Sequence, residues 1–121
     1  MSNVIAIVLC ALLQVESSNS RNIHGYNDGG SAVGVLQIHR VAVREANRIV
    51  GYQRWTYADR HDAEESKEMC RVTMAWHYRR GVKDPVELAC RWNRPDGTAS
   101  RMYRGKVKRA LQRLTNERKV Q

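Results

Sequence analysis

The sequence has little of several features that would place it in a special class of protein. Its 121 residues include no phenylalanine, only two prolines and three cysteines. The cysteines Cys10, Cys70 and Cys90 are odd in number and widely spaced, with no C-x-x-C pair, so they do not indicate a disulfide framework. Cys10 and Cys70 lie on apolar helical faces and are expected to be small buried hydrophobic side chains.

Metal-ligand patterns are also missing. The four histidines show no His-x-x-x-His spacing, and neither a phosphate-binding glycine loop nor a Ser-His-Asp arrangement with a nucleophile elbow is present. No metal site and no cofactor are therefore predicted.

The longest apolar run extends from Val4 to Leu13, far short of the ~20 residues that span a bilayer. No Lys or Arg precedes this run and no small-residue cleavage site follows it, so the pattern does not favour a signal peptide. We expect a buried core helix, no transmembrane segment and no export signal.

Acidic residues are few: 12 Asp and Glu stand against 21 Lys and Arg, a net charge of +9. Such a charge attracts anionic partners, for example a cell envelope or nucleic acid, and charge alone does not separate them. We find no nucleic-acid-binding module, so no specific nucleic acid is predicted. Basic residues are dense near the C-terminus, at Arg101, Arg104, Lys106, Lys108, Arg109, Arg113, Arg118 and Lys119.

The length allows one domain, spanning residues 1–121, and 42% hydrophobic residues suit a folded protein. Asp62 with Glu65, and Asp84 followed by Pro85 and Glu87, are typical helix starts. Apolar periodicity and these signals predict helices at about 3–17, 39–50, 62–80, 85–92 and 100–118. The third of these is expected to turn Met69, Val72, Trp76 and their neighbours inward.

A small β element is expected between the first two helices. Residues 19–30 are rich in Asn, Ser and Gly, and Asn27-Asp28-Gly29-Gly30 is a strong turn signal. Two or three short strands within 23–38 would flank this turn. The predicted fold class is therefore α+β, mostly helical.

Glu16 is the most informative residue, because it closes the apolar helix. A carboxylate there is poorly solvated, which disfavours its charged form and raises its pKa. Such a group holds a proton near neutral pH and can give it to a leaving oxygen, as in the lysozyme example of this effect.

Three blocks in order carry a resemblance to a known family. Glu16-Ser17 is followed by Ser31, Gly34 and Leu36-Gln37-Ile38. Later come Ala89-Cys90-Arg91-Trp92-Asn93, and then Tyr103 and Val107. This pattern resembles the lytic transglycosylases related to goose-type lysozyme, and it implies a lysozyme-like domain.

The resemblance implies cleavage of the β-1,4 bond between N-acetylmuramic acid and N-acetylglucosamine in peptidoglycan, with Glu16 as sole acid and base. In that family the sugar's own 6-hydroxyl attacks and leaves a 1,6-anhydro end. Substrate-binding positions would be Ser31, Gln37, Trp92, Asn93 and Tyr103, and Gly34 would let the chain approach the sugar. Tyr103 also fits the core stripe of its helix, and we favour the core.

Two positions depart from the family pattern. Trp92 stands where the family has Tyr, and its indole N–H donates a hydrogen bond but cannot accept one. Arg94 replaces the usual Gly after Asn93.

Asp28 leaves two alternatives open. It resembles the goose-type carboxylate that positions water, which would make the enzyme a hydrolytic lysozyme with two catalytic residues. It also fits a simple turn former before Gly-Gly, the interpretation we favour slightly. A non-catalytic glycan- or nucleic-acid-binding module is the competing class.

The expected partners are bacterial peptidoglycan and the anionic envelope, with the protein acting as a monomer at the wall or in the periplasm. Compactness and the resemblance suggest a bacteriophage endolysin or virion-associated enzyme, made in the host cytoplasm or carried in the virion.

Overall fold

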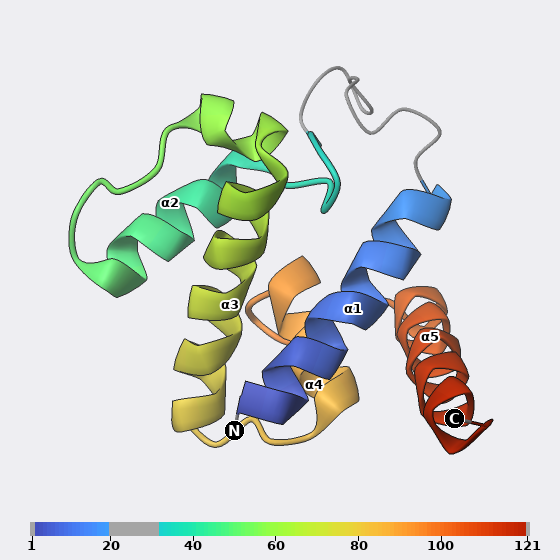
Figure 1. Ribbon diagram of the computed structural model, residues 1–121. Coiled ribbons are helices and arrows are strands. Elements are labelled where there is room, and N and C mark those ends of the chain that lie inside the picture. The colour runs from blue at the N-terminus through green and yellow to red at the C-terminus, as the bar shows by residue number, and fades with distance from the viewer. Residues whose placement is uncertain (1, 20–31, 121) are drawn as a thin grey trace.

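The computed structural model describes residues 2–19 and 32–120, in which five α-helices pack around a common core (Figure 1). Helix α1 lies between α3 and α5, and it also contacts α4 (Figure 1). None of the described helices is both long and apolar enough to cross a membrane. The elements are α1 Ser2–Asn19, α2 Arg40–Val50, the 3-10 helix η2 Tyr57–His61, α3 Ala63–Arg79, α4 Pro85–Asn93 and α5 Arg101–Val120.

The helix ends follow the capping signals of the sequence. The Asp62 carboxylate accepts a hydrogen bond of 2.9 Å from the Glu65 backbone N–H, and Asp84 accepts one of 3.0 Å from the Glu87 N–H. Pro85 occupies the first turn of α4, where its missing N–H costs nothing. Gly51 ends α2 in the left-handed conformation with φ 88°. The five predicted helices are confirmed, each within about two residues at either end.

Helix α1 is covered incompletely, which corrects one expectation. Val8, Ala11, Leu12 and Val15 are buried against α3, α4 and α5. Ala6 and Cys10, four residues apart, are exposed on the side that these helices leave uncovered. The prediction that Cys10 is buried was therefore wrong, whereas Cys70 and Cys90 are buried.

The predicted strands do not appear in the described part of 23–38. Within residues 32–38, an antiparallel bridge joins Val33 and Ile38, with N···O distances of 3.2 and 2.8 Å. Between them the chain turns back through two left-handed residues, Gly34 (φ 85°) and Gln37 (φ 48°), so no ladder can extend there. Residues 23–31 lie outside the described part. The mostly helical prediction is confirmed, and a β element is not shown.

The inward stripe of α3 is shifted from the predicted one. Met69, Cys70, Thr73 and His77 are buried as expected. Val72 and Trp76 are only half-buried, and the guanidinium of Arg80 lies 4.2 Å from the centre of the Trp76 ring. A cation over an indole stabilises a partly exposed tryptophan, so Trp76 belongs to the rim of the core.

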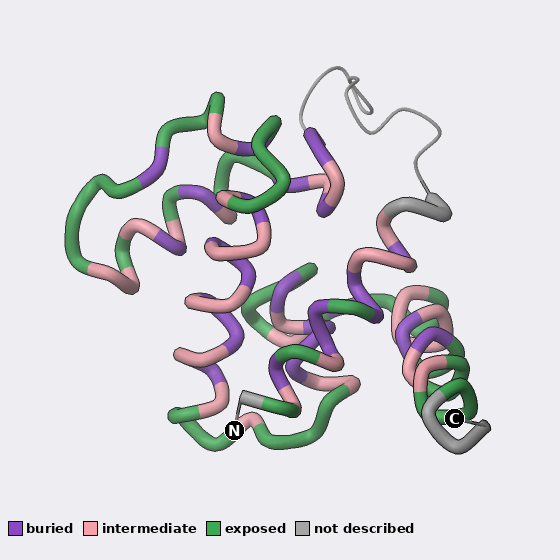
Figure 2. The backbone as a smooth tube through the Cα atoms, viewed as in Figure 1, coloured by how far each residue is buried: buried purple, intermediate pink, exposed green. Residues whose placement is uncertain are grey.

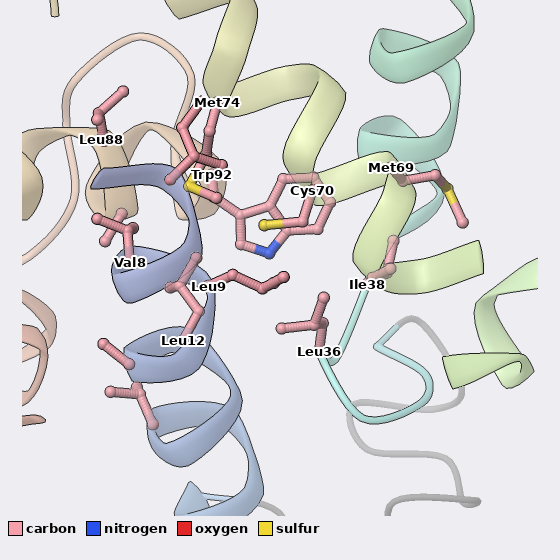
Figure 3. Packing of buried hydrophobic residues seen from close by; sticks show 14 of the residues in the cluster. Val8, Leu9, Leu12, Leu36, Ile38, Met69, Cys70, Met74, Leu88 and Trp92 are labelled. Atoms are coloured by element: carbon pink, nitrogen blue, oxygen red, sulfur yellow. The ribbon is translucent and has the colours of Figure 1, made fainter. Parts of the chain in front are cut away.

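Figure 2 shows the buried stretches along α1, α3 and α4, while segment 51–57 is almost entirely exposed. In Figure 3 the Trp92 ring of α4 points into the cluster formed by side chains of α1 and by Cys70 and Met74 of α3. Leu36 and Ile38 join the same cluster from the 32–38 turn. The core thus joins α1, the 32–38 turn, α3 and α4, which are far apart in the sequence.

Candidate active site

One cavity of about 420 Å³ opens between the end of α1, the 32–38 turn and the end of α4. Glu16 comes from α1, a second group from the 32–38 turn and the start of α2, and a third from the end of α4. This active-site cavity is lined by Glu16, Ala32, Leu36, Gln37, Ile38, His39, Val41, Ala42, Trp92, Asn93 and Pro95.

Glu16 has an unusual protonation equilibrium. Burial raises the pKa of its carboxyl to about 7, because a charged carboxylate is poorly solvated there. A hydrogen bond from Tyr103 and the positive charge of Lys106 act in the opposite direction and lower the pKa. The net result is a carboxyl group that exchanges its proton near neutral pH, as the position of Glu16 in the sequence predicted.

Tyr103 links α5 to this carboxyl. Its ring packs against the core, and its hydroxyl donates a hydrogen bond of 3.1 Å to Glu16 Oε1. Burial raises the pKa of the Tyr103 phenol, so the hydroxyl keeps its proton. The expected core position is confirmed, and the structure adds a direct contact with Glu16. Tyr103 is not among the residues that line the cavity.

Gln37 lines the cavity, and its side chain stabilises the left-handed backbone conformation of the turn. The Gln37 Nε2 donates to the Gly34 carbonyl at 2.7 Å across the turn. The structure gives a steric reason for glycine at position 34. A Cβ added to Gly34 would lie 2.0 Å from the Arg60 carbonyl oxygen, so the close approach of η2 already requires glycine here.

The two α4 residues differ in their role. Trp92 is only 7% exposed and belongs to the core, but it contributes to the cavity wall. Asn93, the last residue of α4, is exposed and lines the cavity, where its amide can donate and accept. Arg94 follows as the helix cap, and Pro95 completes this side.

Sequence reasoning missed several members of the site. Lys106 is three residues, about one helical turn, beyond Tyr103, a spacing that places both side chains on neighbouring positions of α5. Val41, 59% exposed, and Ala42 form an apolar wall at the start of α2, beside His39. Only the nearness of Val41 to Ile38 in the sequence would have suggested this wall.

Two predicted site residues, Asp28 and Ser31, lie outside the described residues. Among the described residues that line the cavity, Glu16 is the only one with a carboxylate. In residues 2–19 and 32–120, no three His, Cys, Asp or Glu side chains lie together as metal ligands would.

No protein-family model matches the chain, and comparison with curated proteins and with solved structures found no similar protein. Function is therefore inferred from the cavity and from the sequence blocks that line it.

Proposed function

We propose that the protein is a lytic transglycosylase that cleaves the β-1,4 bond between N-acetylmuramic acid and N-acetylglucosamine in bacterial peptidoglycan. The observation that carries this proposal is Glu16, a carboxyl group with a pKa of about 7 in a cavity lined by both other family-like blocks. A lysozyme-like arrangement of the helices, action at the bacterial wall and a bacteriophage origin belong to the same proposal.

The size and lining of the cavity suit a sugar. A volume of about 420 Å³ lies within the ordinary range for small-molecule sites. Val41 and Ala42 from the start of α2, and Pro95 from the α4 side, offer apolar surface for ring carbons and acetyl methyl groups. Asn93 and Gln37 supply polar groups at its edge.

In the first step, the protonated Glu16 carboxyl gives its proton to the glycosidic oxygen. The bond between that oxygen and the anomeric carbon then breaks, and positive charge develops on the sugar ring. Glu16 becomes a carboxylate, which the Tyr103 hydroxyl and the Lys106 charge stabilise.

In the second step, the Glu16 carboxylate takes the proton from the 6-hydroxyl of the same sugar. The hydroxyl oxygen bonds to the anomeric carbon and closes a 1,6-anhydro ring, and Glu16 regains its starting protonation state. No water is consumed, and a single carboxyl group serves both steps. This matches a described cavity wall with one carboxylate.

Mass spectrometry of the fragments released from purified peptidoglycan tests this proposal. We expect muropeptides with 1,6-anhydro-muramic ends, each lighter than its hydrolysed counterpart by one water. Reducing ends that carry the added water would show a hydrolytic lysozyme and would make Asp28 the next residue to replace. Folded protein that releases no fragment from several wall types would overturn the assignment as an enzyme.

The pH dependence of fragment release is expected to respond to Tyr103. Because the first step needs a protonated Glu16, activity should fall as pH rises through about 7. The Tyr103 hydroxyl lowers the Glu16 pKa, so Tyr103→Phe should raise that pKa. The pH at which activity falls, the falling limb of the pH–activity profile, should then move to a higher value. Rates measured across a pH series under first-order conditions report this shift.

Two further variants sharpen that experiment. Lys106→Gln should move the limb in the same direction, because it removes a charge that favours the carboxylate. Lys108→Gln is the matched control, since Lys108 is exposed and is not among the groups that shift the Glu16 pKa. A limb that stays in place in Tyr103→Phe would contradict the role of this hydrogen bond.

A further inference from the structure

A second cavity, of about 680 Å³, lies between α2 and the segment 51–57. It shares no lining residue with the active-site cavity. We call it the α2 groove, and its lining residues are Val43, Arg44, Asn47, Arg48, Gly51, Tyr52, Gln53, Trp55, Thr56 and Tyr57.

The outer wall of the α2 groove is held in place by side-chain hydrogen bonds. Asn47 Nδ2 donates to the Trp55 carbonyl at 2.9 Å, and Asn47 Oδ1 accepts from the Arg54 and Trp55 N–H groups at 3.0 and 2.9 Å. Trp55 is 1% exposed, and its indole N–H donates to Glu65. A groove built this way is largely formed before a ligand arrives, which lowers the cost of binding.

The charged residues that line the α2 groove are basic. Arg44 and Arg48 line it, and no lining residue is acidic. The neighbouring acids have structural partners: Glu45 forms an ion pair with Arg48, and Asp59 accepts the Thr56 N–H at 2.8 Å. The Arg48 guanidinium is engaged by Glu45, whereas the Arg44 guanidinium donates to a neutral hydroxyl, that of Tyr57. Arg44 therefore favours an anionic ligand in this groove, and phosphate matches the fork of donors of a guanidinium.

Tyr57 adds a second kind of donor. Its hydroxyl oxygen accepts a hydrogen bond of 3.0 Å from Arg44 Nη1, so the hydroxyl can in turn donate its own proton to a ligand oxygen. The guanidinium groups of Arg40 and Arg60 lie 4.9 and 5.6 Å from the centre of the Tyr57 ring. Arg44 and Tyr57 can therefore donate to the same oxyanion, on a ring that other arginines already pack against.

The rest of the lining suits hydroxyl-bearing units. Tyr52 is 61% exposed and presents an aromatic ring, while Gln53 and Thr56 supply an amide and a hydroxyl. A nucleic-acid strand usually stacks successive bases on several aromatic platforms. Of the two exposed aromatic rings in the lining, the Tyr57 ring lies against Arg40 and Arg60, which leaves the Tyr52 ring as the platform for a ligand. A single platform favours polyol or sugar units over a strand of bases.

We propose that the α2 groove binds the phosphate groups of an anionic wall polymer built from polyol or sugar phosphates. Arg44 and Tyr57 hold the phosphate, and Tyr52 packs against the adjoining polyol or sugar. The choice of a wall polymer rests on the proposed function, whereas the affinity for a phosphate monoester does not. Such a site would hold the protein on the wall while the active-site cavity works on a glycan strand.

The first test is a titration of the full chain with glycerol 3-phosphate, followed by two-dimensional NMR, with glycerol as the uncharged control. We expect shifts at the Trp55 indole N–H and the Asn47 side-chain amide, and little change at the Trp92 indole. Arg44→Gln should weaken binding by roughly tenfold, the loss expected for one charge-assisted hydrogen bond.

Two variants control this titration. Arg44→Lys keeps the positive charge but loses the planar pair of guanidinium donors, so this variant should bind glycerol 3-phosphate with intermediate affinity. Arg113→Gln removes the same charge from the exposed face of α5 and should bind like the unchanged protein. Equal weakening by Arg44→Gln and Arg113→Gln would reduce the effect to net charge and overturn the site. Tighter, Arg44-dependent binding of a thymidine oligonucleotide would overturn the wall-polymer ligand.

The second test uses cell walls. Arg44→Gln should sediment less with intact walls but equally with walls stripped of phosphate polymers, and it should release fragments from stripped peptidoglycan at the normal rate. Fragment release without any phosphate binding would refute the α2 groove proposal and leave the enzyme assignment standing. Phosphate binding without fragment release would do the reverse.

Discussion

Replacing Glu16 with glutamine is expected to abolish fragment release and, at the same time, to stabilise the folded protein above pH 7. Glutamine keeps the shape and a carbonyl oxygen that can accept from Tyr103, but it has no proton to give to the glycosidic oxygen. Loss of a general acid typically costs about 10²- to 10⁴-fold in rate. Release of soluble fragments from purified peptidoglycan measures this loss.

The gain in stability follows from the raised pKa. In the unfolded chain the Glu16 pKa is near its ordinary 4.5, and in the folded protein it is about 7. The folded state therefore holds the proton more tightly, and this contribution to stability is complete below about pH 4.5 and is lost as pH rises through about 7. The full shift corresponds to about 3 kcal/mol as an upper value, since the carboxyl is only partly buried.

Thermal unfolding of both proteins at about pH 4 and about pH 8.5 checks the sign. Glu16→Gln should match the unchanged protein at the lower pH and melt several degrees higher at the upper one. Glu117→Gln, on the exposed side of α5, is the matched control and should leave activity and melting unchanged. An identical melting difference at both pH values would contradict the assigned pKa.

Replacing Gly34 with alanine is expected to give the largest loss of stability of any single methyl addition considered in this chain. Its φ of 85° disfavours any residue with a Cβ, and that Cβ would lie 2.0 Å from the Arg60 carbonyl oxygen. The carbonyl is fixed by a hydrogen bond of 3.0 Å from Ser66 Oγ. We expect a loss of about 3 to 5 kcal/mol in the free energy of unfolding, read from the midpoint of urea denaturation.

Gly51→Ala is the matched control for this substitution. Gly51 has nearly the same φ, 88°, but nothing lies within 4 Å of its ideal Cβ. Its loss should be about 1 to 2 kcal/mol, the cost of the left-handed backbone alone. If both variants lose the same free energy, the contact between Gly34 and Arg60 is not what requires glycine.

The helices could be predicted because the signals that start and end them lie in the neighbouring sequence. Asp62, Asp84 and Pro85 act within one helical turn of their own position, so no knowledge of the tertiary fold is needed. The raised pKa of Glu16 was also predictable, because a carboxyl at the end of an apolar helix is buried in most ways of packing that helix.

The features that could not be predicted depend on which helices and loops pack against each other in the folded protein. Cys10 sits on an apolar helix, yet its exposure follows from where α3, α4 and α5 leave α1 uncovered. A glycine at position 34 indicates only that a side chain is disfavoured there. The sequence does not show that the Arg60 carbonyl is the group that a Cβ would contact. The α2 groove needs a loop folded back by Asn47, whose three bonds reach seven and eight residues along the chain.

The hydrogen bond between Tyr103 and Glu16 has a consequence for the order in which the site is made. The two residues are 87 positions apart, and the ribosome makes the carboxyl long before the hydroxyl. Until α5 emerges, one side of α1 has no partner, and neither Tyr103 nor Lys106 is present to stabilise the Glu16 carboxylate. A nascent chain that stops before Arg101 therefore carries the Glu16 carboxyl without the two groups that stabilise its charged form. The Glu16 carboxyl therefore acquires its final protonation equilibrium only after α5 has been made and has packed against α1.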